Sequence, residues 1–87
     1  MTNEDLLSFP CRFPIKVMGR HDPQLESEVY RIVRRHVPDL GEGAITLRES
    51  AKGNYVSLTV TINATSRQQL DDLYRELSGC ELTLMVL

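Results

Sequence analysis

Residues 52–63, Lys-Gly-Asn-Tyr-Val-Ser-Leu-Thr-Val-Thr-Ile-Asn, contain a turn signal followed by strict alternation of apolar and polar side chains. This alternation predicts a β-strand with one buried face and one open face. The apolar positions, which should face the core, are Val56, Leu58, Val60 and Ile62. The polar positions, which all carry a hydroxyl group, are Tyr55, Ser57, Thr59 and Thr61. Because the hydroxyl-lined face must meet water, a ligand or another subunit, we expect function to lie there.

Upstream of this strand, the sequence predicts a strand, a helix and a second strand. Alternation over residues 12–18 predicts the first strand, where Pro14 must sit at the start or at a bulge because it has no N–H group. Asp22 and Pro23 are typical of a helix N-cap and first helical position. Residues 44–49 alternate again, and the following turn predicts a hairpin between the second and third strands.

Downstream, the period changes to that of a helix and then returns to that of a strand. Ser66 and Gln69 match a capping box, and Gly79 is the expected end of the second helix. Residues 80–87 predict the last strand. Its core-facing positions are expected to be Leu82, Leu84 and Val86.

The order strand, helix, strand, strand, helix, strand predicts a ferredoxin-like α+β sandwich. Right-handed crossovers give an antiparallel sheet in the order 4-1-3-2, with both helices on one face. We expect a flexible N-terminal arm at residues 1–11 and one domain at 12–87. This arrangement separates Cys11 from Cys80 by roughly 20 Å, so both should be free thiols.

Composition narrows the class of protein. The chain has 87 residues, 41% of them hydrophobic and 25% charged, with no apolar run long enough to span a membrane. Its acidic N-terminus lacks a signal-peptide pattern, which indicates a cytoplasmic protein. The formal net charge of −2 argues against a non-specific nucleic-acid binder, because such proteins normally carry an excess of basic residues.

Recognisable catalytic chemistry is missing from the sequence. There is no nucleophile paired with a base and no pair of carboxylates at a known spacing, so we expect a non-enzymatic protein. His21 and His36 stand apart from other ligand residues, so we expect no metal and no cofactor. A basic cluster at residues 31–35 is typical of a solvated helix face, although an acidic partner could use it.

The open face of the expected sheet is the main candidate site. Its expected members are Lys16, Met18, Thr46, Arg48, Tyr55, Ser57, Thr59, Thr61, Thr83 and Met85. One interpretation is a solvated sheet, since hydroxyl-bearing residues are favoured there. The other is a docking surface for a protein partner or a second copy, since methionine and tyrosine are common at interfaces. Residues 52–56 also invite comparison with the RNA-recognition motif, but its two stacking positions fall on Asn54 and the inward Val56.

The second candidate is the loop Gly19, Arg20, His21 and Asp22, which precedes a helix N-terminus. Free N–H groups at such a terminus can bind an anion or the carboxylate of a small-molecule effector. The alternative interpretation is ordinary capping of the helix by Asp22.

Three segments together resemble the small bacterial YbeD-like family of uncharacterised proteins. They are Phe13-Pro14-Ile15-Lys16-Val17-Met18-Gly19, Lys52-Gly53-Asn54-Tyr55 and Met85-Val86-Leu87. The resemblance implies a fold similar to regulatory ACT domains, which bind amino acids and pair through sheet edges or helices. It also implies a regulatory role, because relatives are often encoded near lipoate-transfer enzymes, and a shared surface that includes Lys16, Lys52, Asn54 and Tyr55. Gln24 follows Pro23 where ACT domains have a glycine, and its side chain could obstruct an amino-acid ligand.

Overall fold

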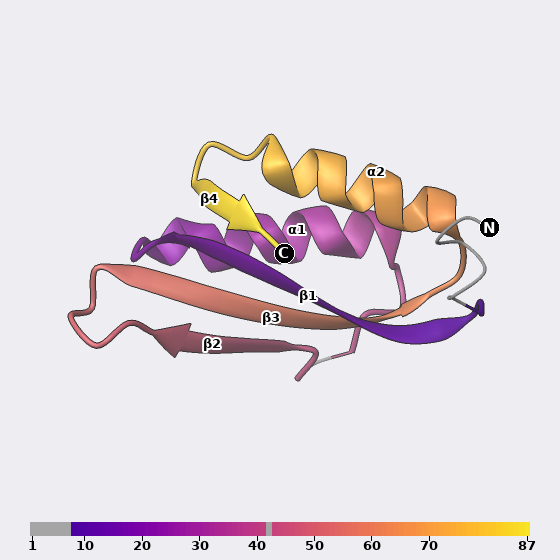
Figure 1. Ribbon diagram of the computed structural model, residues 1–87, viewed down its shortest axis with the longest axis horizontal. Helices are drawn as coiled ribbons and strands as arrows, with labels where there is room; N and C mark the ends of the chain where they lie inside the picture. Colours follow the sequence, from indigo (N-terminus) through magenta and orange to yellow (C-terminus); the bar gives the residue numbers. More distant parts are fainter. Residues whose placement is uncertain (1–7, 42) are drawn as a thin grey trace.

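Two helices lie on one face of a four-stranded antiparallel sheet in the computed structural model, which describes residues 8–41 and 43–87 (Figure 1). The elements in chain order are β1 (Cys11–Arg20), α1 (Pro23–His36), β2 (Ile45–Glu49), β3 (Tyr55–Ala64), α2 (Arg67–Ser78) and β4 (Thr83–Val86). The strand order is β2-β3-β1-β4, which is the predicted order 4-1-3-2 read from the other edge. The predicted ferredoxin-like fold is therefore confirmed.

The core lies between the sheet and the helices. β1 and β3 pair along ten residues each, from Cys11 opposite Ala64 to Arg20 opposite Tyr55. Their fully buried side chains meet those of the helices in one cluster, which includes Ile15, Val17, Leu58, Val60, Leu25, Val29, Val33, Leu73 and Leu77. Because strand side chains alternate, burying this set forces the polar residues of β1 and β3 onto the opposite face.

The helix ends agree with the capping signals in the sequence. Asp22 accepts a hydrogen bond from the backbone N–H of Gln24 at 2.9 Å, and Pro23 opens α1. Ser66 accepts one from the N–H of Gln69 at 3.1 Å, and Gly79 is the C-cap of α2. Side-chain oxygens thus satisfy N–H groups that lack partners in the first turn of a helix.

The prediction that Pro14 lies at the start of a strand or at a bulge is wrong, because Pro14 lies inside β1. The N–H groups of a strand point alternately to its two neighbours, and that of Lys16 donates to Leu87, just beyond β4. The nitrogen of Pro14 points to the same side, where β4 pairs only with the segment from Val17 to Gly19. A proline is therefore tolerated because this part of β1 is a sheet edge.

Strand β4 corrects the predicted alternation of the last segment. Val86 lies opposite Val17 and Met85 opposite Met18, but a register shift then places Thr83 opposite Gly19. Gly19 faces the helices, so Thr83 faces them too instead of the open face, and its hydroxyl oxygen is buried. The extra residue is Leu84, which was expected in the core and is 56% exposed. Because a bulge inserts one extra residue into the alternation, the strand residues before it point to the opposite face of the sheet.

The predicted arm, residues 1–11, falls mainly on residues 1–7, which lie outside the described part of the chain together with the expected anchors Leu6 and Leu7. Phe9 packs against the core, and Cys11 already belongs to β1. Cys11 and Cys80 are half-buried free thiols, as predicted.

Candidate functional site: the open sheet face

The helices leave one face of the sheet uncovered (Figure 1). The register of the strands arranges the side chains of this face in rows. One row contains Arg48 of β2, Ser57 of β3, Met18 of β1 and Met85 of β4. The next row contains Thr46, Thr59 and Lys16 in the same strand order. The register therefore brings together side chains from four separate segments of the sequence.

A shallow hollow of about 330 Å³ lies in the middle of this face. Its lining consists of two cationic and three hydroxyl side chains, namely Lys16, Arg48, Thr46, Ser57 and Thr59. Hydroxyl groups can donate to an anion, while lysine and arginine supply charge and further donors. The hollow therefore combines the groups that recognise a carboxylate or a phosphate.

The outward positions of the strands are basic although the chain has a net charge of −2. They carry Arg12, Lys16, Arg20 and Arg48 and no aspartate or glutamate. Within the described ranges, none of these four cations has an acidic partner within ion-pair distance, whereas four other arginines there pair with a carboxylate. Positive charge on this face is thus not neutralised by neighbouring side chains.

Apolar side chains border the hollow. Tyr55 is 51% exposed and lies opposite Arg20, two residues along β3 from Ser57. Met85 is 50% exposed and lies opposite the half-buried Met18. The face therefore has a cationic, hydroxyl-lined hollow over β1, β2 and β3, with the methionines of β1 and β4 on one side of it and Tyr55 at the start of β3.

The predicted ligand loop and the predicted hairpin residues lie at one end of this face. The N–H of His21 donates to the carbonyl of Asn54 at 3.0 Å, and its Nδ1 lies 2.9 Å from the carbonyl oxygen of Gly53. Its Nε2 lies 3.4 Å from Glu49. These contacts fasten the start of α1 to the β2–β3 turn, which contains Lys52 and Asn54 just before β3 begins.

The loop itself has little room for a ligand. Asp22 occupies the N–H of Gln24, as in ordinary capping. A Cβ atom on Gly19 would come within 2.5 Å of the Leu82 carbonyl oxygen and 2.7 Å of Leu25. Gly19 and Arg20 are part of β1, and Arg20 points to the open face opposite Tyr55.

In the basic cluster of α1, two of the three arginines pair with carboxylates and the third is held by a tyrosine. Arg31 donates to Glu28 at 2.7 Å, which raises the pKa of Arg31, and Arg34 donates to the hydroxyl of Tyr30 at 2.8 Å. Arg35 forms an ion pair with Glu76 of α2. This cluster therefore differs from the open face, where the cations lack such partners.

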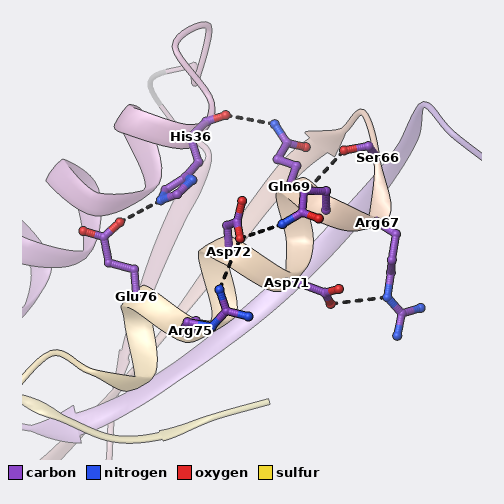
Figure 2. A network of polar contacts seen from close by, with 9 residues as sticks. His36, Ser66, Arg67, Gln69, Asp71, Asp72, Arg75 and Glu76 are labelled. Carbon is purple, nitrogen blue, oxygen red and sulfur yellow. Dashed lines mark hydrogen bonds and ion pairs between the residues drawn. The ribbon is translucent and has the colours of Figure 1, made fainter.

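Figure 2 shows the polar network that joins α1 to α2. The ring nitrogen Nε2 of His36 lies 2.7 Å from Oε1 of Glu76. Gln69 donates to the carbonyl of His36 at 2.9 Å and accepts from the N–H of Thr65 at 2.8 Å. The network fixes the C-terminal end of α1 against α2, and it lies on the helical side of the molecule, away from the open face.

Other features of the described chain offer weaker sites. A larger hollow of about 500 Å³ at the far end of the sheet includes both Arg12 and Asp39 in its lining, so it presents no single charge to a ligand. Burial raises the pKa of Tyr74 above its ordinary value of 10.0, and its hydroxyl donates to the carbonyl of Leu87 at 3.1 Å. No group of three metal-ligating side chains occurs in residues 8–41 and 43–87, and no helix there is long and apolar enough to cross a membrane.

The fold places the chain among ACT-like ferredoxin-like domains. The ACT domain from a GTP pyrophosphokinase of Chlorobium tepidum has a TM-score of 0.65 at 17% identity, covering 87% of this chain and 84% of that one. Protein HP0495 from H. pylori has a TM-score of 0.74 at 12% identity, covering 100% and 94% of the two chains. At these identities the likeness shows the fold alone.

The family model for a protein of unknown function, DUF493, matches residues 4–87, and the chain belongs to this family. A UPF0250 protein of Chromobacterium violaceum is 48% identical over 84 residues, which are 97% of this chain and 94% of that protein. A UPF0250 protein of Nitrosomonas europaea is 44% identical over 87 residues, the full length of both. These relatives confirm the resemblance to the YbeD-like family, and their names state no reaction.

The sequence interpretation placed seven residues on a shared surface. Five of them, Lys16, Met18, Tyr55, Ser57 and Met85, lie on the open face. The other two, Lys52 and Asn54, lie in the turn between β2 and β3.

The sequence interpretation also expected Thr46, Arg48 and Thr59 on the open face, but it did not predict that these three surround one hollow with Lys16 and Ser57. It missed the uniform positive charge of the face, although the absence of acidic residues from the outward strand positions is readable once the alternation is assigned.

Proposed function

We propose that this protein is a non-enzymatic regulatory or interaction module that binds another protein through its open sheet face. The observation that carries the proposal is the exposure of Tyr55 and Met85, at 51% and 50%, on a face that no helix covers. Tyrosine and methionine are common interface residues, and methionine adapts to the shape of a partner. Exposed apolar groups with a polar surround are typical of interaction sites.

The variant Tyr55→Ala tests this proposal. Tyr55 is half exposed and does not belong to the core cluster, so the melting temperature of the variant should stay within a few degrees of wild type. Truncation of an anchoring tyrosine commonly costs about 2 kcal/mol or more of binding. We therefore expect weaker association, measured by quantitative capture from lysate and, for a second copy of the chain, by analytical ultracentrifugation.

The matched control is Tyr30→Ala, because Tyr30 is also exposed, at 37%, but lies on α1. It should bind like wild type. Equal association for wild type and both tyrosine variants would contradict the proposal and leave the open face as a solvated sheet.

Amino-acid sensing through residues 19–22 and RNA binding stay predictions of the sequence, and no contact in the loop favours the first. A thermal-shift measurement with amino acids, and an electrophoretic measurement with RNA, test them, because a ligand of the native state raises its apparent stability.

A further inference from the structure

We propose that the partner presents an acidic segment to the open face, with carboxylates over Lys16 and Arg48 and apolar side chains against Met18 and Met85. The inference rests on the interaction role proposed above and adds the chemistry of the partner. It is carried by the hollow, by the charge of the face and by the apolar border together.

Charge complementarity is the first step. Lys16 and Arg48 line one hollow of about 330 Å³ with three hydroxyl groups, and no acidic side chain occupies an outward strand position. The backbone carbonyl oxygen of Leu87, at the sheet edge, accepts from the Lys16 N–H and the Tyr74 hydroxyl, each at 3.1 Å, and leaves the Lys16 ammonium group unengaged by these contacts. The ammonium group of Lys16 and the guanidinium group of Arg48 can therefore each bind a carboxylate of a partner.

The apolar border is the second step. Arg48, Ser57, Met18 and Met85 form one row from β2 to β4, so a segment that crosses the strands meets a cation first and methionines next. Such a segment needs acidic and apolar residues close together. A simple inorganic anion would use the hollow but leave the exposed methionine and tyrosine uncovered.

A second copy of this chain fits the face poorly. A two-fold symmetric interface brings the same patch against itself. It would set Lys16, Arg20 and Arg48 of one copy against the same cations of the other. Like charges opposed across an interface are unfavourable, so we infer that this face binds a different, acidic surface.

Single-stranded RNA also fits less well than a peptide. Sequence-tolerant RNA binding uses several aromatic platforms on which bases stack. Tyr55 is the only aromatic side chain at an outward position of the described strands. The methionines beside the hollow suit apolar side chains better than successive bases.

The test is a fluorescence-anisotropy titration of the intact protein with a short labelled peptide of alternating glutamate and leucine. We expect saturable binding at low salt that weakens as salt rises. Lys16→Glu and Arg48→Glu should each weaken it roughly tenfold, because a reversed charge replaces an attraction by a repulsion. Arg34→Glu changes the net charge equally on α1 and should alter binding by less than about twofold.

Thermal melting of each variant establishes that it is folded, and Lys16→Gln and Arg48→Gln repeat the test with smaller changes. A peptide that fails to bind, or that binds Lys16→Glu and Arg48→Glu as tightly as wild type, would overturn the proposal. So would a polyuridine RNA that binds in a Lys16-dependent way while the acidic peptide does not.

Capture from lysate separates this inference from the proposed function. If Tyr55→Ala weakens capture and both charge reversals leave it intact, the face is an interface but the acidic partner is wrong. If none of the three variants changes capture, both proposals are wrong. Loss of capture in all three, together with peptide binding, supports both.

Discussion

The helical layer and the open sheet face carry charged side chains in different ways. On the helices, Arg67 pairs with Asp71 and Arg75 with Asp72 along α2, and Arg35 reaches from α1 to Glu76. On the sheet, Lys16 and Arg48 face a hollow of hydroxyl groups without an acidic partner in the described chain. These helical charges are thus paired inside the molecule, and the sheet charges are left for solvent or a partner.

Secondary structure explains part of this difference. Residues three or four apart on a helix are neighbours, so a single segment can supply both members of an ion pair. On a sheet the neighbours come from other strands. Lys16 lies opposite Thr59, and Arg48 lies opposite Ser57, so the register brings hydroxyl groups to the cations. Charged residues on the helices can therefore stabilise the domain through ion pairs, while the cations of the open sheet face stay available to a partner.

The largest expected effect distinguishes the two faces of β3. Val60 is 0% exposed in the core, so Val60→Asp buries a charge without a partner and should cost several kcal/mol, enough to unfold much of the population. Thr59→Asp places the same charge on the open face beside Lys16 and should be mild. Urea unfolding followed by circular dichroism measures both. A Val60→Asp protein that melts like wild type would refute the assignment of faces.

Strong local signals explain why most of the fold was predictable. The alternation of residues 55–62 requires one buried face, and the caps at Asp22 and Ser66 fix where each helix begins. Strand β4 was less predictable, because its bulge depends on how it meets β1 rather than on its own pattern. Alternation alone therefore placed Leu84 and Thr83 on the wrong faces.

The candidate site was predictable only in part for a related reason. Alternation identifies the outward residues, but a hollow depends on which outward residues become neighbours. Lys16 and Arg48 come from strands that are separated by β3, so only the register brings them to one place. The sequence interpretation weighed net charge for the whole chain, whereas the charge that matters to a partner is that of one face.

A smaller effect is expected where β1 meets the helical layer. Gly19→Ala would place a Cβ atom within 2.5 Å of the Leu82 carbonyl oxygen and 2.7 Å of Leu25, so the backbone before β4 must shift. Overpacking of this kind typically costs about 1–3 kcal/mol.

The matched control is Gly79→Ala, whose added atom would lie 3.5 Å or more from its nearest neighbours. Its free energy of unfolding should be within about 0.5 kcal/mol of the wild-type value. Chemical unfolding of both variants measures the difference. Equal stabilities would mean that the close contact at Gly19 does not constrain the approach of β4 to β1.

The smallest effect tests the comparison of charges directly. Glu76→Gln removes the negative charge that pairs with Arg35, and partly exposed pairs of this kind are worth about 0.5–1 kcal/mol. Arg48→Gln removes a cation without a structural partner, so the free energy of unfolding should be unchanged or slightly higher as repulsion on the open face falls. Urea unfolding at low and high salt checks both, and salt should reduce the loss in Glu76→Gln. If Arg48→Gln lost as much stability as Glu76→Gln, Arg48 would have a structural role, and its charge would not be free for a partner.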